Sequence, residues 1–104
     1  MKEEHNFKYL VDIDKTICWT EGDDYENAQP IQERIDKMNK LVEEGNIVDY
    51  WTARGADSGI SYDELTRNQL SKWKVKYHAL GNKPFANLYI DDLAINSNDF
   101  FKGQ

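Results

Sequence analysis

Two carboxylates and a hydroxyl stand close together near the start of the chain, at Asp12, Asp14 and Thr16. They come at the end of residues 7–13 (FKYLVDI), a short apolar run rich in strand-forming residues that predicts a buried strand. Two carboxylates at one strand end repel each other unless a cation neutralises them, and Mg²⁺ prefers oxygen ligands of this kind. The pair therefore indicates a magnesium site, although a pair of this type also occurs where a strand simply ends in a solvated loop.

Three later side chains suit a phosphoryl group that is being transferred. Thr52 and Arg54 follow a second apolar run and supply a hydroxyl and a guanidinium. Lys83, ahead of Pro84, supplies a point charge that stabilises phosphate and shields a nucleophile. Each of these residues alone has an ordinary explanation as part of a strand-ending loop or as a solvated surface lysine.

A second pair of carboxylates, Asp91 and Asp92, ends another apolar run at residues 85–90. When the first and last strands of a doubly wound sheet lie side by side, carboxylates at their ends meet. We therefore expect the two acidic pairs to share one metal ion.

The elements that must position these side chains are predicted from apolar periodicity and from turn residues. Pro30 suits the first turn of a helix whose apolar residues recur at helical spacing until Gly45, and Ser61 with Glu64 forms a capping-box pattern at the start of a second helix. Residues 19–29 are polar and acidic and predict an excursion over the surface. The predicted strands are residues 7–13, 46–51, 75–80 and 85–90, and residues 93–101 are expected to form a short helix.

Alternation of strands and helices predicts an α/β fold with a mainly parallel sheet and helices on its faces. Ligands of such sheets collect at the carboxyl ends of the strands, which is where the chemically useful residues stand. The predicted fold and the candidate site therefore agree.

Composition limits the classes of function. The chain has 104 residues, of which 39% are hydrophobic and 31% charged, and this predicts one folded domain over residues 1–104. The net charge of -6 disfavours nonspecific binding to nucleic acid. Cys18 is the single cysteine, which excludes an intrachain disulfide, and no apolar run approaches the roughly 20 residues that cross a bilayer. We expect a cytoplasmic protein without a membrane partner.

The ordered motifs resemble those of the haloacid dehalogenase superfamily. The resemblance covers most of the chain and rests on residues 12–16 (DIDKT), Thr52, Lys83 and Asp91-Asp92. The stretches WTARG (51–55) and KPFANLYIDDLA (83–94) look most like the small capless phosphatases of that superfamily, which include enzymes of sugar and surface-polysaccharide metabolism. The resemblance implies a Rossmann-like three-layer sandwich without a cap domain, and a small phosphorylated substrate such as a sugar phosphate. The family pattern commonly has glycine where this chain has Lys15, which leaves the local loop shape open.

The resemblance also implies the role of each residue. Asp12 would attack phosphorus to form an aspartyl-phosphate, and Asp14 would protonate the leaving oxygen and then activate water. Phosphoryl oxygens would be held by Thr52 and Lys83. Arg54 is a further candidate for phosphate binding on the chemistry of its guanidinium alone. Mg²⁺ would be bound by Asp12, the backbone carbonyl of Asp14, and Asp92 supported by Asp91.

Other functions stay open beside this one. One is a catalytically silent binding or regulatory domain of the same fold, since the chain has no cap domain to enclose a small substrate. A capless site suits either a macromolecular phosphoester or a small substrate that a neighbouring subunit of a homo-oligomer encloses. Another is a receiver-like phospho-acceptor domain, against which the order of the motifs argues, because the paired acids follow Lys83 and Pro84. The resemblance also implies that residues 18–25 form a small flap beside the site. Trp19 and Tyr25 lie in this segment, and we expect them to pack the flap down rather than touch substrate.

Overall fold

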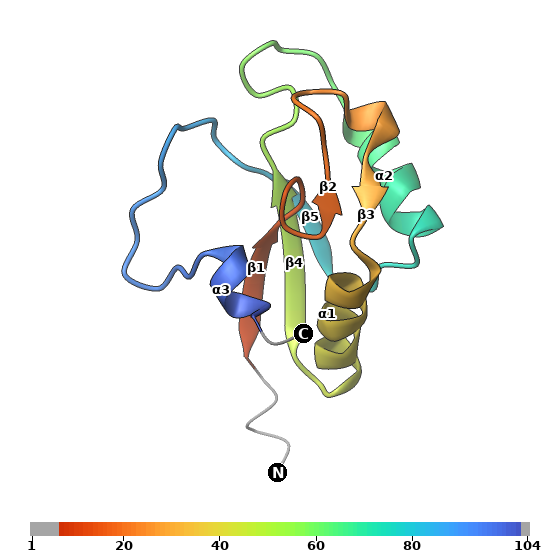
Figure 1. The fold of residues 1–104 in the computed structure, drawn as a ribbon, viewed down its shortest axis with the longest axis vertical. Helices are drawn as coiled ribbons and strands as arrows, with labels where there is room; N and C mark the ends of the chain where they lie inside the picture. Colours follow the sequence, from red (N-terminus) through yellow and green to blue (C-terminus); the bar gives the residue numbers. More distant parts are fainter. Residues whose placement is uncertain (1–6, 103–104) are drawn as a thin grey trace.

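Three parallel strands form the sheet on which the candidate site is built. The computed structural model describes residues 7–102. In it β1 (Lys8–Asp12), β4 (Ile47–Thr52) and β5 (Ala79–Asn82) lie side by side in the order β1-β4-β5 (Figure 1). The parallel register sets Asp12 beside Trp51 and Thr52 beside Asn82. The carboxyl ends of all three strands therefore meet at one edge of the sheet.

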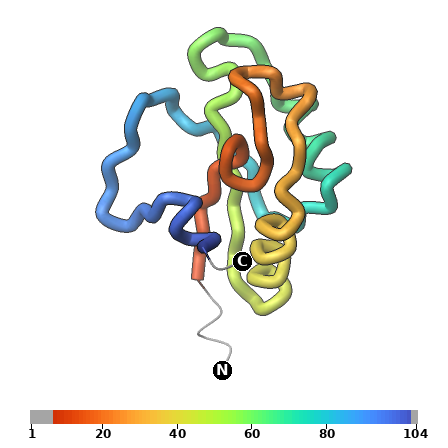
Figure 2. The backbone as a smooth tube through the Cα atoms, viewed as in Figure 1, coloured from red at the N-terminus to blue at the C-terminus, as the bar shows by residue number. Residues whose placement is uncertain are grey.

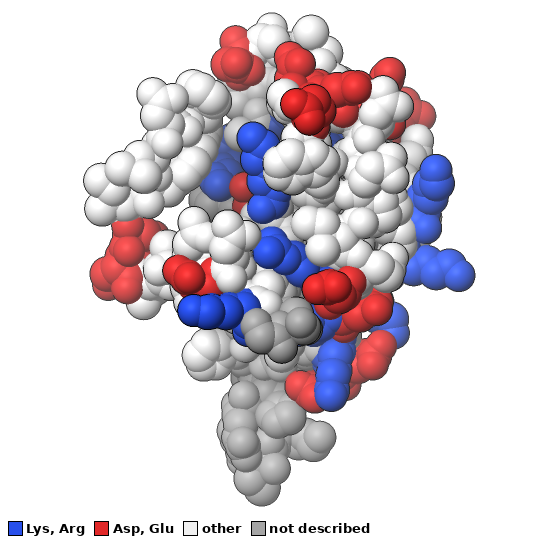
Figure 3. All heavy atoms as spheres, viewed as in Figure 1, with Lys and Arg blue, Asp and Glu red and all other residues white. Residues whose placement is uncertain are grey.

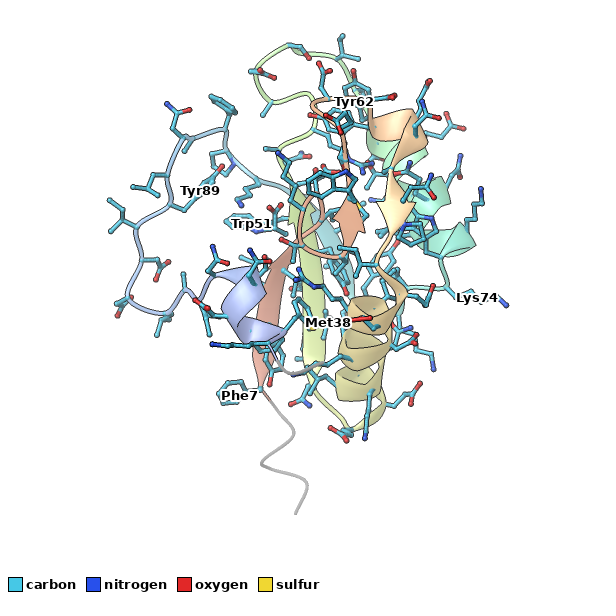
Figure 4. All side chains as sticks on the ribbon, in the orientation of Figure 1. Phe7, Met38, Trp51, Tyr62, Lys74 and Tyr89 are labelled. Carbon is cyan, nitrogen blue, oxygen red and sulfur yellow. The ribbon has the colours of Figure 1, made fainter. Side chains whose placement is uncertain are left out.

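Two helices cross over between these strands. The first, α1 (Gln32–Glu43), buries Ile35 and Met38 on the face turned to the sheet, as its apolar spacing predicts, and Figure 4 shows Met38 on this helix. It ends where Gly45 takes a φ of 101°, a left-handed conformation that glycine adopts without steric cost. The second, α2 (Asp63–Lys72), connects β4 to β5. A short third helix, α3 (Ser97–Phe100), lies within the region where a short helix was expected.

The helices pack on one face of the sheet. Val48 and Tyr50 of β4 belong to one buried cluster with residues of all three parts of the helical layer: Ile35 and Met38 of α1, Leu70 and Trp73 at α2, and Phe101 after α3. The opposite face carries Leu10, which is 54% exposed. Two right-handed crossovers that run in the same direction along a sheet put both helices on the same face. Within residues 7–102 the protein is therefore a two-layer α/β structure, and the predicted third layer is not formed.

Residues 18–30, called the flap here, stand over the end of β1. Two short antiparallel strands, β2 (Cys18–Trp19) and β3 (Gln29–Pro30), enclose a 3₁₀ turn, η2 (Tyr25–Asn27). This hairpin replaces the irregular excursion that the polar composition predicted. Pro30 is part of β3 and not of the first turn of α1, where it was expected. The expectation rested on the fact that the first turn of a helix tolerates proline, because the N–H groups of that turn have no acceptor within the helix.

The second helix begins without the predicted capping box. Tyr62 occupies the N-cap position of α2 and makes no side-chain capping bond, while Ser61 Oγ accepts a long 3.5 Å hydrogen bond from the Asp63 amide. The third predicted strand is displaced toward its carboxyl end, because only residues 79–82 pair with β4. Lys74, with a φ of 59°, turns the chain between α2 and that strand.

The predicted strand at residues 85–90 is wrong in this structure. Residues 84–96, called the outer segment here, have no regular secondary structure and form a loop that stands away from the rest of the chain (Figure 2). Its apolar side chains are exposed, with Leu88 at 73% and Ile90 at 89%. Strand propensity alone does not produce a strand, because the backbone needs a pairing partner, and β1 remains an edge of the described sheet. No helix among the described residues is long and apolar enough to cross a membrane.

Candidate active site

The sheet brings Asp12 and Lys83 together from its two outer strands. Asp12 is the last residue of β1, and Lys83 directly follows β5, where its amide donates a 2.9 Å hydrogen bond to the carbonyl of Thr52. Lys83 Nζ lies 3.4 Å from Asp12 Oδ2, and the two side chains are 13% and 35% exposed. Burial raises the pKa of the Asp12 carboxyl above its usual value, and the nearby Lys83 ammonium opposes that rise. An anchored carboxylate beside a fixed positive charge is suited to attack on phosphorus.

Thr52 lies on the strand between these two residues. It is the last residue of β4 and is buried, and its Oγ1 accepts a 3.1 Å hydrogen bond from the Arg54 amide. Accepting this bond orients the hydroxyl at the edge where Asp12 and Lys83 meet. A hydroxyl in this place can donate to an anionic oxygen.

Asp14 is held by a two-pronged contact with Arg54. Arg54 Nε donates to Asp14 Oδ2 at 2.9 Å, and Arg54 Nη2 donates to Asp14 Oδ1 at 2.8 Å. Thr20 Oγ1, from the flap, donates to the same Oδ1 at 2.7 Å. Burial by itself would raise the pKa of Asp14, but the hydrogen bonds from Arg54 and Thr20 hold it below its usual value. Asp14 is therefore an ionised and firmly oriented carboxylate.

Arg54 directs its donors at protein atoms instead of at the open edge. Besides Asp14, its guanidinium contacts Thr66 Oγ1 at 3.1 Å, Gln69 Oε1 at 2.7 Å and Cys18 Sγ at 4.0 Å. Its side chain is 0% exposed. A guanidinium has five N–H groups, and these contacts engage all of them. The predicted role of Arg54 in phosphate binding does not match this arrangement.

The loop after Asp12 has a conformation that glycine would adopt more easily. Lys15 has a φ of 64°, and its amide donates to the Cys18 carbonyl at 2.8 Å. Thr16 is buried, and its amide donates to the Ile13 carbonyl at 3.2 Å. The loop therefore makes a left-handed turn at Lys15, a conformation that glycine adopts without steric cost.

The two flap aromatics differ in their packing. The Tyr25 ring lies 4.9 Å from the Arg54 guanidinium and makes an edge contact with Tyr62, with ring centroids 4.9 Å apart. Trp19 is 55% exposed and lies 5.9 Å from Lys15 Nζ. The expectation that both aromatics pack the flap down therefore agrees with the structure for Tyr25 and not for Trp19.

Asp91 and Asp92 lie apart from the other predicted site residues. Both are exposed on the outer segment, where Asp91 Oδ1 accepts a 2.8 Å hydrogen bond from the Leu93 amide. Within residues 7–102 no three Asp, Glu, His or Cys side chains are grouped so that they could hold a metal ion. The donor set in this arrangement does not fit the predicted Mg²⁺ site, because the strand expected to deliver the second acidic pair has not formed.

Several residues that shape the site were not singled out from the sequence. Thr66 and Gln69 are polar yet buried on the inner face of α2, spaced three residues apart, so that both reach Arg54. Polar residues within an apolar helical stripe are the signal that could have found them. Tyr89, from the outer segment, places its ring 4.0 Å from Lys83 Nζ, and Trp51 lies 5.5 Å from the same atom (Figure 4). No sequence pattern indicates that contact.

A cavity of about 540 Å³ opens beside the site, between the loop after β4, the start of α2 and the end of β5. It is bordered by Thr52 and Lys83 and continues to Asn82 and Tyr62. Its volume lies in the range of about 300–1,000 Å³ that is usual for small-molecule sites.

Comparison with known proteins identifies a similar structure. No family model matches the chain, and no curated protein matches it. The chain is similar to a crystal structure of an MCSG target from Vibrio cholerae, with 26% sequence identity and a TM-score of 0.79, over 90% of this chain and 86% of that one. The chain is a small α/β protein whose parallel sheet and helices are consistent with a Rossmann-like fold.

Proposed function

We propose that this chain is a phosphomonoester hydrolase of the haloacid dehalogenase type that works through an aspartyl-phosphate. The observation that supports it most is the convergence of Asp12, Thr52 and Lys83 at one sheet edge, with 3.4 Å between the carboxylate and the ammonium. These residues come from separate segments of the chain, and their types are those that in-line phosphoryl transfer requires.

In the first step an Asp12 carboxylate oxygen attacks phosphorus while the bond between phosphorus and the leaving oxygen breaks. Asp14 is ionised before substrate binds, so it first takes a proton from the monoanion of the phosphate ester. The leaving oxygen then takes this proton from the Asp14 carboxyl and departs as an alcohol. In the second step water attacks the phosphorus of the aspartyl-phosphate, gives its proton to Asp14, and releases inorganic phosphate and the Asp12 carboxylate. Thr52 and Lys83 hold the phosphoryl oxygens in both steps.

Dependence on Mg²⁺ is part of the proposal and comes from the resemblance. In the structure Asp12 lies at the site, whereas Asp91 and Asp92 do not. Both chemical steps are therefore assigned to side chains that the structure places at the site, and none is assigned to the metal ion. For Asp92 or Asp91 to join Asp12, the outer segment would have to move to the free edge of β1.

A small phosphorylated metabolite, such as a sugar phosphate, is the substrate class that we propose. The cavity beside Thr52 and Lys83 has the volume for the alcohol part of such a molecule. Asp and Glu side chains gather at the end of the molecule that carries the turn of the flap and the loop after β4 (Figure 3), among them the exposed residues Glu21, Asp23, Asp24 and Asp57. This acidic rim opposes the approach of a polyanion.

A catalytically silent binding domain is the second candidate. The separation of Asp91 and Asp92 from Asp12 favours it, because a phosphatase of this type without its metal ligands would be inactive. A phosphatase would release phosphate from its substrate, whereas a silent domain would bind a ligand without releasing phosphate.

The test is phosphate release from a panel of phosphorylated metabolites and p-nitrophenyl phosphate in the presence of Mg²⁺. We expect turnover of at least one substrate by the wild-type chain and none by Asp12→Asn. Saturable binding of phosphate or of a panel member without release of phosphate would support the silent domain instead.

A further inference from the structure

The Arg54 guanidinium is fixed from three directions. The Asp14 carboxylate lies against one side, and Thr66 and Gln69 of α2 receive hydrogen bonds from Nη1 at 3.1 and 2.7 Å. The Tyr25 ring covers the guanidinium at 4.9 Å. A planar fork that is bonded at both ends has little freedom to rotate, which distinguishes it from an exposed arginine.

The fixed guanidinium in turn fixes the orientation of the Asp14 carboxylate. Oδ1 accepts from Arg54 Nη2 and Thr20 Oγ1, whereas Oδ2 accepts from Arg54 Nε. Two parallel bonds from one guanidinium hold the carboxylate in the plane of the fork. The Asp14 side chain is 21% exposed, so it still reaches solvent at the site.

The same network joins the flap to α2. Gln69 accepts from Arg54 through Oε1 and donates through Nε2 to the Tyr25 carbonyl at 2.6 Å. The position of the flap backbone and the position of the Asp14 carboxylate therefore both depend on the buried side chains of Arg54 and Gln69.

We propose that Arg54 is a positioning residue, which holds Asp14 in the orientation needed for both proton transfers and does not bind the phosphoryl group. The inference rests on the proposed phosphatase function. Lysine cannot replace Arg54 here, because a single ammonium cannot bond to both Asp14 oxygens while also reaching Thr66 and Gln69.

The test separates the two chemical steps by the choice of leaving group. 2,4-Dinitrophenolate leaves without a proton, so its release does not need Asp14, whereas phenolate does. For Arg54→Lys we expect kcat on phenyl phosphate to fall by about 100-fold with KM within about twofold, as for the loss of a general acid and base. With 2,4-dinitrophenyl phosphate we expect a burst equal to the enzyme concentration followed by slow turnover, which the wild type does not show.

Arg34→Ala is the matched control. Arg34 donates to the Thr16 carbonyl at 3.0 Å and stacks on Phe101, so it supports the same loop without touching Asp14. We expect millimolar guanidinium chloride to restore part of the kcat of Arg54→Ala and none of any activity lost in Arg34→Ala.

Three results would overturn the inference. A raised KM with unchanged kcat in Arg54→Lys would mean that Arg54 binds the phosphoryl group. Equal losses on the two aryl phosphates without a burst would mean that Arg54 does not act through Asp14. A wild-type chain that hydrolyses no phosphoester would instead refute the proposed function, and the inference with it.

A second variant covers the case in which the Arg54 variants do not fold. Gln69→Leu keeps the Asp14 contact but removes one outer support of the guanidinium. We expect a smaller loss, of about tenfold, with the same burst on the dinitrophenyl ester. A folded Gln69→Leu with wild-type kinetics on both esters would count against the inference.

Discussion

Lys83 Nζ lies 3.4 Å from Asp12 Oδ2, although β4 lies between β1, which ends at Asp12, and β5, which Lys83 directly follows. The lysine crosses that distance because it follows β5 directly and its amide is tied to the Thr52 carbonyl. Parallel strands put all three residues at one edge, so the approach of these groups follows from topology.

Asp12→Asn should abolish turnover while the fold is kept. An amide has a similar volume but cannot form the acyl-phosphate. Asp49→Asn is the matched control, because Asp49 also lies on the sheet and pairs with a lysine, Lys8 at 3.4 Å, but away from the carboxyl edge. Phosphate release should be lost in the first variant and stay within about twofold in the second. Substantial activity in a highly purified Asp12→Asn would remove Asp12 from the nucleophile role.

Asp14→Asn and Asp92→Asn should respond differently to Mg²⁺. Loss of Asp14 removes the acid and base, which we expect to cost about 10²- to 10⁴-fold in kcat at any metal concentration. Loss of Asp92 should weaken metal binding, so that high Mg²⁺ restores part of the activity. Activity titrations against Mg²⁺, with EDTA as the zero point, measure both responses. Rescue of Asp14→Asn together with no rescue of Asp92→Asn would contradict the assigned roles.

Cys18 should resist alkylation and should make the fold sensitive to alkaline pH. Its thiol is buried, and burial raises its pKa from 9.0 to about 11, with the Asp14 charge adding to the rise. A group whose pKa is raised in the fold contributes stability that is complete below its unfolded pKa and is lost as the pH passes its folded pKa. The free energy of unfolding should therefore fall by roughly 2–3 kcal/mol between about pH 9 and 11.

Denaturant unfolding from pH 8 to 11 measures this dependence, with Cys18→Ala as the comparison that isolates the thiol from lysine and tyrosine titration. Iodoacetamide at pH 8 should label the unfolded chain and leave the native chain unmodified. Rapid labelling of the native chain would mean that the thiol is accessible.

Lys15→Gly should stabilise the protein. A non-glycine residue in the left-handed region is strained, and glycine removes that strain at an entropic cost, so the net gain should be about 1 kcal/mol. Lys74 has a φ of 59° and lies after α2, so Lys74→Gly is a control for the backbone effect alone. Chemical denaturation should show a gain in both variants. A loss of stability in Lys15→Gly with a gain in Lys74→Gly would mean that the Lys15 side chain, near Trp19, contributes more than the strain costs.

The sequence predicts those parts of the molecule that depend on local pattern. β1, α1 and β4 follow from short apolar runs and from a helical stripe that ends at a glycine. The clustering of Asp12, Thr52 and Lys83 follows because parallel strands end at a common edge. The partners of Arg54 do not follow, since they depend on which face of α2 reaches the site. The structure of residues 85–90 does not follow from the sequence either. Their strand propensity is high, but a strand also needs the edge of a neighbouring strand to pair with, and propensity does not provide that partner.

The outer segment should respond to Mg²⁺. It carries Leu88 and Ile90, which are among the most exposed apolar side chains of the described residues. If Mg²⁺ is bound by Asp12 together with Asp92, the segment must approach the free edge of β1, and its amides would then be hidden from solvent. Hydrogen exchange of the peptide that spans residues 85–92 should therefore slow by about tenfold or more when Mg²⁺ is added, and not when KCl of equal ionic strength is added. Asp92→Asn should lose the effect, whereas Asp99→Asn, a control carboxylate on α3, should keep it. Identical exchange with and without Mg²⁺ would show that the metal does not recruit the segment, and would favour the silent binding domain over the phosphatase.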